Sequence, residues 1–209
     1  MDWRALALAA LVAGPLPATA ADQFQIKLRG VTIGTLIVDN SRSGGQYDFR
    51  TQFHTSGVAG VVKKVQFVMQ SRGLLSGHLP QPRSYGERMD TGQRSSNAAI
   101  SFPQGDARWD PNTAMVYALS PRPLDAGCAL TRRLFDGERT NDLALIETAR
   151  SDAALTCTGS MTRIAGYSAE ELERRQHRIE LTYAAQGDAY VITEVRTQTV
   201  YGDVTITPR

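Results

Sequence analysis

The chain has 209 residues, a length that fits one domain of ordinary size or one large β domain. Its hydrophobic content of 42% is enough for a core and excludes global disorder. With 23 basic and 21 acidic residues the net charge is only +2, which gives no reason to expect a nucleic-acid partner, because such proteins carry a clustered basic excess.

The first 20 residues have the three parts of a secretory signal peptide. A short charged start is followed by an apolar run over residues 5–13 and then by Ala18-Thr19-Ala20, small residues of the kind that a signal peptidase recognises. We therefore expect export, cleavage after Ala20 and a single mature domain over residues 21–209. No apolar run is long enough to span a bilayer. The alternative, an N-terminal helix of the fold, is disfavoured by Pro15 and Pro17.

From residue 23 onward, apolar and polar residues alternate with the period of two that is typical of half-buried strands. Pro80 and Pro82 make residues 74–85 an edge strand or an extended loop, because a central strand needs those N–H groups. Residues 40–45, rich in Ser and Gly, are predicted to be a loop. Strands are predicted over residues 23–29, 31–38, 47–55, 65–70, 96–102, 153–164, 178–184, 190–199 and 204–207. Their number predicts a mainly β protein with a meandering antiparallel sheet or an open barrel.

Two places carry helix signals. Asp110 followed by Pro111 is a typical helix start, with the aspartate as N-cap, and Pro121 ends the apolar segment that follows. Ser168 and Glu171 have the spacing of a capping box, which predicts a second short, polar helix. One or two short helices are therefore expected beside the sheet.

Two β-type runs meet at Asp136-Gly137, which predicts a hairpin over residues 130–147. A type I′ turn explains both residue types, because Gly supplies positive φ and Asp tolerates it. The alternative is that the Asp136 and Glu138 carboxylates form an acid–base pair. We prefer the turn.

The only two cysteines, Cys128 and Cys157, bracket this hairpin. Two cysteines in an exported chain indicate one disulfide, and closing a loop of about 30 residues stabilises a fold by about 3–4 kcal/mol. Two free thiols and half of a metal site are the alternatives. A metal site would require further Cys or His at ligand spacing, so no metal and no cofactor are predicted.

Several short motifs occur in one order along the chain. They are Gly30-Val31-Thr32-Ile33-Gly34, Tyr47-Asp48-Phe49, Ser71-Arg72-Gly73, Pro82-Arg83-Ser84-Tyr85, Asp110-Pro111-Asn112-Thr113-Ala114, the run from Phe135 to Leu143, and Ile164-Ala165-Gly166-Tyr167. Through them the chain resembles the bacterial exported family called domain of unknown function 3108. The resemblance implies a periplasmic protein of a Gram-negative bacterium. It also implies a strongly bent antiparallel sheet, like the half-barrels of lipoprotein carriers and their β-spiral relatives. It implies no catalytic residues, because the family's activity is undefined.

An apolar stripe on neighbouring strands is the candidate binding site, and it comprises Phe49, Phe53, Phe67 and Met69. A sheet must bury one face, so a core role is the first interpretation. In an open sheet with few covering helices, part of that face stays accessible and marks a ligand or partner site. The leading hypothesis is a non-enzymatic periplasmic envelope protein that binds a lipid, a lipoprotein or a periplasmic protein partner on a concave face.

An envelope hydrolase acting on cell-wall or lipid substrates is the alternative hypothesis. It would require a nucleophile, a base and an orienting acid. The histidines, His54, His78 and His177, are isolated in the sequence, and no Gly-x-Ser-x-Gly elbow occurs. No catalytic residue is therefore predicted.

Overall fold

The computed structural model describes residues 21–57, 64–92, 95–199 and 201–209. The signal peptide expected at residues 1–20 lies outside the described residues. Within the described ranges, no helix is long and apolar enough to cross a membrane.

Thirteen strands of the described residues form one antiparallel sheet. They are β1 (Asp22–Leu28), β2 (Val31–Ser43), β3 (Gln46–Thr55), β4 (Gln66–Ser76), β5 (Leu79–Asp90), β6 (Ser95–Ser101), β7 (Arg122–Pro123), β8 (Leu130–Phe135), β9 (Thr140–Arg150), β10 (Ala154–Ala165), β11 (Gln176–Gln186), β12 (Ala189–Thr199) and β13 (Gly202–Pro208). The order across the sheet is β6-β5-β4-β3-β2-β1-β13-β12-β11-β10-β9-β8, and β7 pairs with β12 outside this path. Most neighbours are consecutive in the chain, as a meander requires.

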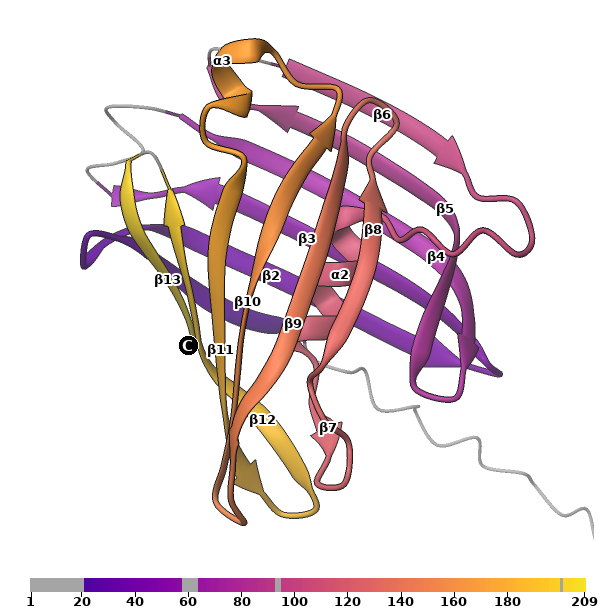
Figure 1. Ribbon diagram of the computed structural model, residues 1–209, viewed down its shortest axis with the longest axis vertical. Helices are drawn as coiled ribbons and strands as arrows, with labels where there is room; N and C mark the ends of the chain where they lie inside the picture. Colours follow the sequence, from indigo (N-terminus) through magenta and orange to yellow (C-terminus); the bar gives the residue numbers. More distant parts are fainter. Residues whose placement is uncertain (1–20, 58–63, 93–94, 200) are drawn as a thin grey trace, which may run out of the picture.

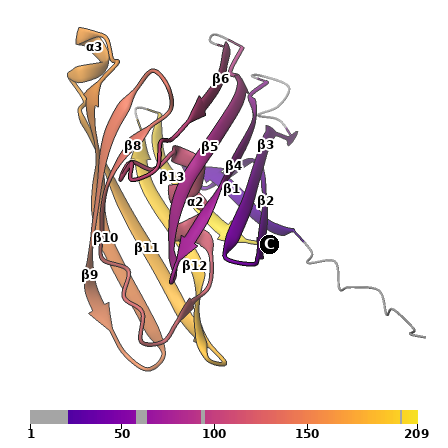
Figure 2. The same ribbon diagram turned by 90° about the vertical axis from the view of Figure 1, so that its right-hand side faces the viewer.

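The pairing of β1 with β13 divides the sheet into an N-terminal half (β1–β6) and a C-terminal half (β8–β13). The two halves face each other with their strands crossing, and the helix α2 (Pro111–Leu119) lies between them (Figures 1 and 2). α2 contacts β3, β4 and β5 on one side and β8 and β12 on the other. One hydrophobic core, which includes Phe24, Phe49, Leu155 and Tyr183, spans both halves.

The predicted fold class is confirmed: the protein is mainly β, with an antiparallel sheet and two short helices in the described residues. The sheet is open, because its outermost strands β6 and β8 each pair with only one neighbouring strand. Both helix starts are confirmed as well. Asp110 caps α2, and Ser168 and Glu171 form the capping box of α3 (Ala169–Leu172).

Three local predictions need correction or refinement. The predicted loop 40–45 is mostly strand, because β2 continues to Ser43 and only Gly44 and Gly45, both with positive φ, form the turn. β5 is an internal strand, yet β6 pairs with it only from Ser84 onward. Pro80 and Pro82 therefore lie in the part of β5 that pairs only with β4 and has no neighbour on its other side. Proline suits this position because it has no N–H to donate to a second neighbouring strand.

The hairpin at Asp136-Gly137 is confirmed, but the type I′ turn is wrong. Phe135 pairs with Thr140, so the loop has four residues, 136–139. Gly137 has a φ of +100°, whereas Arg29 is the only non-glycine residue with positive φ in the described chain. The Asp136 carboxylate accepts hydrogen bonds from the backbone N–H groups of residues 138 and 139, at 2.9 and 2.6 Å. An Asx-type cap therefore replaces the expected left-handed aspartate.

The predicted disulfide between Cys128 and Cys157 is confirmed, with a Cα–Cα distance of 6.1 Å. Both residues are buried. The bond links the segment between α2 and β8 to β10, so it ties the chain that leaves α2 to the C-terminal half of the sheet.

Candidate functional site

A buried hydrogen-bond network attaches α2 to the N-terminal half of the sheet. Ser71 of β4 donates to one carboxylate oxygen of Asp110 at 2.5 Å. Thr113 donates its backbone N–H to the same oxygen at 2.8 Å and its hydroxyl to the other at 2.7 Å. Asn112 donates from Nδ2 to the Phe49 carbonyl at 3.0 Å and to the Ser71 hydroxyl at 2.9 Å. The network fixes both the position and the rotation of the helix.

The electrostatics of this network indicate a structural role. Asp110 is completely buried, and burial raises the pKa of its carboxyl, against the lowering effect of the bonds from Ser71 and Thr113. Burial likewise raises the pKa of Tyr47, whose hydroxyl lies 3.1 Å from the Thr113 hydroxyl. These groups are buried and bonded to one another, so they hold α2 against the sheet.

The opposite side of α2 lines an apolar cavity of about 190 Å³ against the C-terminal half of the sheet. Five of its thirteen lining residues belong to α2 and eight to β8–β13, and all are apolar. They are Pro111, Ala114, Met115, Ala118, Leu119, Leu134, Leu143, Leu145, Met161, Ile179, Leu181, Val195 and Ile206. Alternation explains the strand residues, because every second side chain of these strands points inward.

The residues that line the cavity are not equally buried. Leu119, Leu145 and Leu181 are buried, whereas Met115 and Met161 are only half-buried, as are Ala118, Ile179 and Ile206. The half-buried members therefore mark the mouth. Two of them are methionines, whose unbranched side chains adapt easily to the shape of a ligand.

Gly159 lies between Leu145 and Ile179 in the same row of the sheet. A Cβ at this position would collide with the Ala144 carbonyl of β9. Glycine is therefore required by the close approach of the β9 backbone, and it leaves the cavity floor without a side chain at this point.

The four residues predicted to bind ligand lie on the inner face of β3 and β4, but none lines this cavity. Phe49 is fully buried, and Met69 is buried in a smaller cluster with Tyr85 and Phe102. Phe53 and Phe67 stack at 5.4 Å between ring centroids and line a separate hollow of about 780 Å³ at one end of the N-terminal half. Phe49 and Phe53 share the main core cluster, and Phe67 packs against both this cluster and that of Met69, so the four lie in the core of the N-terminal half, and a ligand role for them stays a prediction.

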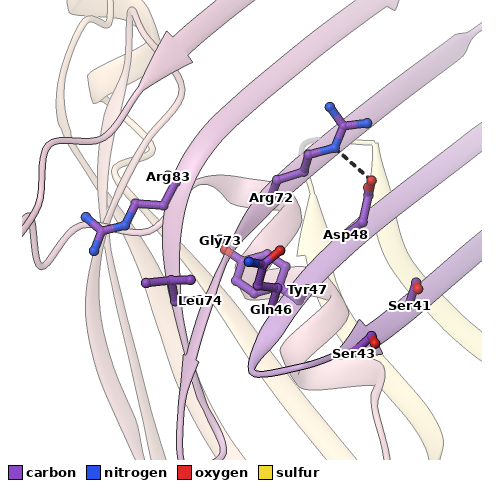
Figure 3. A pocket seen from close by; sticks show the side chains of 9 residues that line it. All are labelled: Ser41, Ser43, Gln46, Tyr47, Asp48, Arg72, Gly73, Leu74 and Arg83. Carbon is purple, nitrogen blue, oxygen red and sulfur yellow. Dashed lines mark hydrogen bonds and ion pairs between the residues drawn. The ribbon is translucent and has the colours of Figure 1, made fainter.

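A hollow of about 470 Å³, lined mainly by residues with polar side chains, lies over β2–β5 (Figure 3). At its edge, Arg72 Nε and Asp48 Oδ2 form an ion pair at 2.7 Å, whereas the Arg83 side chain points away from this pair. Burial would raise the pKa of Asp48, but hydrogen bonds from Gln70 and Arg72 outweigh it and lower the pKa. The side chains of Arg72 and Asp48 are 61% and 41% exposed, so this is a solvated ion pair on the surface.

The structure does not bring the histidines together. His54 lies on β3, His78 in the β4–β5 turn and His177 on β11. Among the described residues, no group of three His, Cys, Asp or Glu side chains is placed to hold a metal ion.

No family model, curated protein or solved structure matches this chain. Function is therefore inferred from the cavity and the sequence. The sequence did contain one signal for the cavity. Residues 114–119 are apolar on every side, and a helix that is apolar all round must be covered on every side. The N-terminal half alone does not cover it.

Proposed function

We propose that this protein is a non-enzymatic cell-envelope protein that holds an apolar chain, such as an acyl chain of a lipid or lipoprotein, between α2 and the C-terminal half of the sheet. The observation that carries the proposal is that all thirteen side chains lining the cavity are apolar. Such a cavity offers a guest no hydrogen bond, and a water molecule requires two to four polar partners. An apolar guest gains by leaving water and gives up no hydrogen bond on entering the cavity.

The size of the cavity sets the size of the guest. Pockets for drug-sized ligands occupy about 300–1,000 Å³, whereas an apolar cavity of about 150 Å³ holds benzene. At about 190 Å³ the cavity fits the end of one chain rather than a whole lipid. The polar part of the ligand would stay in water at the mouth, beside Met115 and Met161.

We place the protein in the periplasm. The signal peptide expected over residues 1–20 and the resemblance to the exported family support this assignment. The disulfide between Cys128 and Cys157 supports an oxidising compartment outside the cytoplasm.

Methionine methyl NMR tests the proposal without any substitution. The chain carries Met115 and Met161 at the cavity mouth, and Met69 and Met89 on the N-terminal half. Titration of ¹³C-methyl-methionine protein with sodium dodecanoate, below its micelle concentration, should shift the first pair saturably and leave the second pair in place.

Two results would count against the cavity. If Met69 and Met89 shift while Met115 and Met161 do not, the ligand occupies the aromatic stripe of the N-terminal half instead. If none of the four methyl signals moves, the protein does not bind an acyl chain. Sodium butyrate serves as the control, because it carries the same carboxylate on a chain too short to gain much from burial.

A further inference from the structure

The two edge strands of the sheet, β8 and β6, are protected to different degrees against pairing with a further strand. On β8, the backbone groups that point away from β9 are largely occupied. Trp109 donates its N–H to the Arg133 carbonyl at 2.9 Å and accepts from the Phe135 N–H at 2.8 Å. The Arg132 guanidinium donates to the Thr131 carbonyl at 2.8 Å. This edge is closed to a further strand.

The β6 edge lacks such protection. The Phe102 N–H donates to the Arg83 carbonyl, so residue 102 points its backbone groups toward β5. In an antiparallel pair of strands, only every second residue bonds to the neighbouring strand. Residues 96, 98 and 100 therefore bond to β5, whereas 95, 97, 99 and 101 point their backbone groups outward. In the described part of the chain, nothing bonds to these outward groups. β6 also has neither proline nor charge, the usual devices against strand addition.

A groove of about 510 Å³ runs along this edge, lined by β6, by Glu87 of β5 and by the β8–β9 turn at residues 136–138. The turn lies beside β6, on the side to which the Ala98 and Ile100 side chains point. A Cβ at Gly137 would come within 3.0 Å of Ile100 Cγ2 and 3.9 Å of the Ala98 Cβ. A strand added to β6 would therefore project every second side chain into the groove.

Three acidic residues, Glu87, Asp136 and Glu138, line the groove and give it a negative charge. Glu87 accepts hydrogen bonds from the Tyr85 and Ser96 hydroxyls, and Asp136 accepts from the backbone of its own turn. Across the described residues, neither Glu87 nor Asp136 has a basic partner. Burial raises the pKa of Tyr85, and the hydrogen bond to Glu87 and the charges of Glu87, Asp110 and Asp136 raise it further. Both carboxylates therefore act on the same small region.

We propose that β6 accepts an extended segment of another protein, a strand with Arg or Lys at every second position, whose basic side chains lie in this groove. Outward backbone groups supply the affinity and the carboxylates supply the specificity, as in other strand-addition interfaces. A second copy of this chain fits less well. Two β6 strands paired antiparallel would bring two sets of Glu87 and Asp136 together, and like charges repel.

Four synthetic heptapeptides test the proposal against the folded protein. In the first, threonine alternates with arginine. The second replaces arginine with glutamate. The third has the sequence of the first, with the backbone nitrogens of its threonines methylated. The fourth has the same sequence, with the backbone nitrogens of its arginines methylated instead. The first should bind saturably and shift the amide signals of Asn97 and Ala99. The second, and one of the two methylated forms, should bind at least about 10-fold more weakly, because they lose charge attraction or edge hydrogen bonds.

Substitution at Ala99 tests the same contact from the protein side. Proline removes the outward N–H of residue 99, which bonds to nothing in the described structure, and an edge strand tolerates such a proline. Ala99→Pro should weaken the arginine peptide at least about 10-fold, whereas Ala99→Ser, which keeps the N–H, should change it less than about 2-fold. Asp136→Asn keeps the turn acceptor and should weaken it about 3-fold.

Several outcomes would overturn the proposal. Equal binding of the arginine peptide and both methylated forms would reduce the contact to charge attraction alone. Equal binding to Ala99→Pro and the unmodified protein would place the peptide elsewhere. A dimer that forms without peptide and is lost in Ala99→Pro would assign the edge to a second copy. Dodecanoate binding should be unchanged in Ala99→Pro, so failure here is distinguishable from failure of the cavity.

Discussion

α2 meets the two halves of the sheet in opposite ways. Toward the N-terminal half, Asp110, Asn112 and Thr113 form buried hydrogen bonds to β3 and β4. Toward the C-terminal half, the side chains of Ala114, Ala118 and their neighbours make apolar contacts that leave a cavity, and one hydrogen bond joins the Tyr183 hydroxyl to the Ala118 carbonyl at 2.8 Å. Hydrogen bonds are directional and fix one geometry, whereas apolar contacts tolerate several.

This difference teaches how a small domain can keep an open interior. Protein cores are normally packed as densely as organic crystals, and a void costs stability. Here the polar network holds the helix on one side, so the other side need not be tightly packed to keep the helix in place. Changes on the polar side should therefore act on stability, and changes on the apolar side should act on binding.

The largest effect is expected for Asp110→Ala. The substitution removes the helix N-cap and leaves the buried hydroxyls of Ser71 and Thr113 without their acceptor. Losing a cap costs about 1 kcal/mol and each of the two unsatisfied buried hydroxyls about 1–3 kcal/mol, so the unfolding free energy should fall by about 3–7 kcal/mol. Urea unfolding followed by circular dichroism measures it.

Asp39→Ala is the matched control, because Asp39 is an exposed aspartate of β2. It should change the unfolding free energy by no more than about 0.5 kcal/mol. An Asp110→Ala effect as small as that of the control would mean that the network does not hold the helix.

The disulfide gives the next largest effect. Cys128→Ser should lower the unfolding free energy by about 3 kcal/mol, because the 29-residue separation closes a long loop of the unfolded chain. Thermal melts with and without reductant measure it: reductant should destabilise the unmodified protein and leave the variant unchanged. The role of the bond would be contradicted if the unmodified protein melted at the same temperature with and without reductant, provided that alkylation confirmed the release of both thiols.

The helix starts and the strand faces could be predicted because they depend on neighbours in the chain. Asp110 and Pro111 are enough to start α2, because the aspartate is its N-cap and the proline its first residue. The alternation of apolar and polar residues along β3 places Phe49 and Phe53 on the inner face. The turn at Asp136 was predicted incorrectly because a side-chain bond to the following N–H groups competes with the left-handed backbone conformation.

The candidate site could not be predicted in the same way. Its walls come from α2 and from six strands, so the cavity exists only once the two halves of the sheet face each other. Local patterns do not determine that arrangement, which depends on the pairing of β1 with β13 at opposite ends of the chain. The aromatic stripe was the strongest local apolar signal, and α2 contributes to its burial in the core.

A smaller, pH-dependent effect separates the charge of Asp110 from its capping role. The pKa of Asp110 is raised in the folded protein, so the folded protein keeps the proton on this carboxyl at pH values where the unfolded chain, above about pH 3.9, has released it. Stability should therefore be fully present below that pH and decline as the pH rises toward the folded pKa. Asp110→Asn, which cannot ionise, should lack this decline when urea unfolding is compared from pH 3 to pH 8. Parallel curves for both proteins would show that burial does not disfavour the charge.

On the apolar side, Ala118→Leu should act mainly on binding. The larger side chain enters the cavity mouth, and overpacking costs about 1–3 kcal/mol where no space is available and less where a cavity exists. Unfolding free energy should change by less than about 1 kcal/mol, while dodecanoate affinity falls at least about 10-fold. Ala144→Leu is the control, since Ala144 is exposed on β9. If both variants bind dodecanoate equally well, the ligand does not enter between α2 and the sheet.

The smallest effect is expected outside the core, at the ion pair of Arg72 and Asp48. Both side chains are more than one-third exposed, so water screens their attraction, and Asp48→Asn should cost about 0.5 kcal/mol or less. The pKa of Asp48 is lowered in the fold, so its contribution is present above about pH 3.9 and is lost as the pH falls through the folded value. Urea unfolding at pH 7 and in 0.5 M salt measures the cost. A loss comparable to that of Asp110→Ala would show that the outer face, and not the network beneath α2, holds the N-terminal half together.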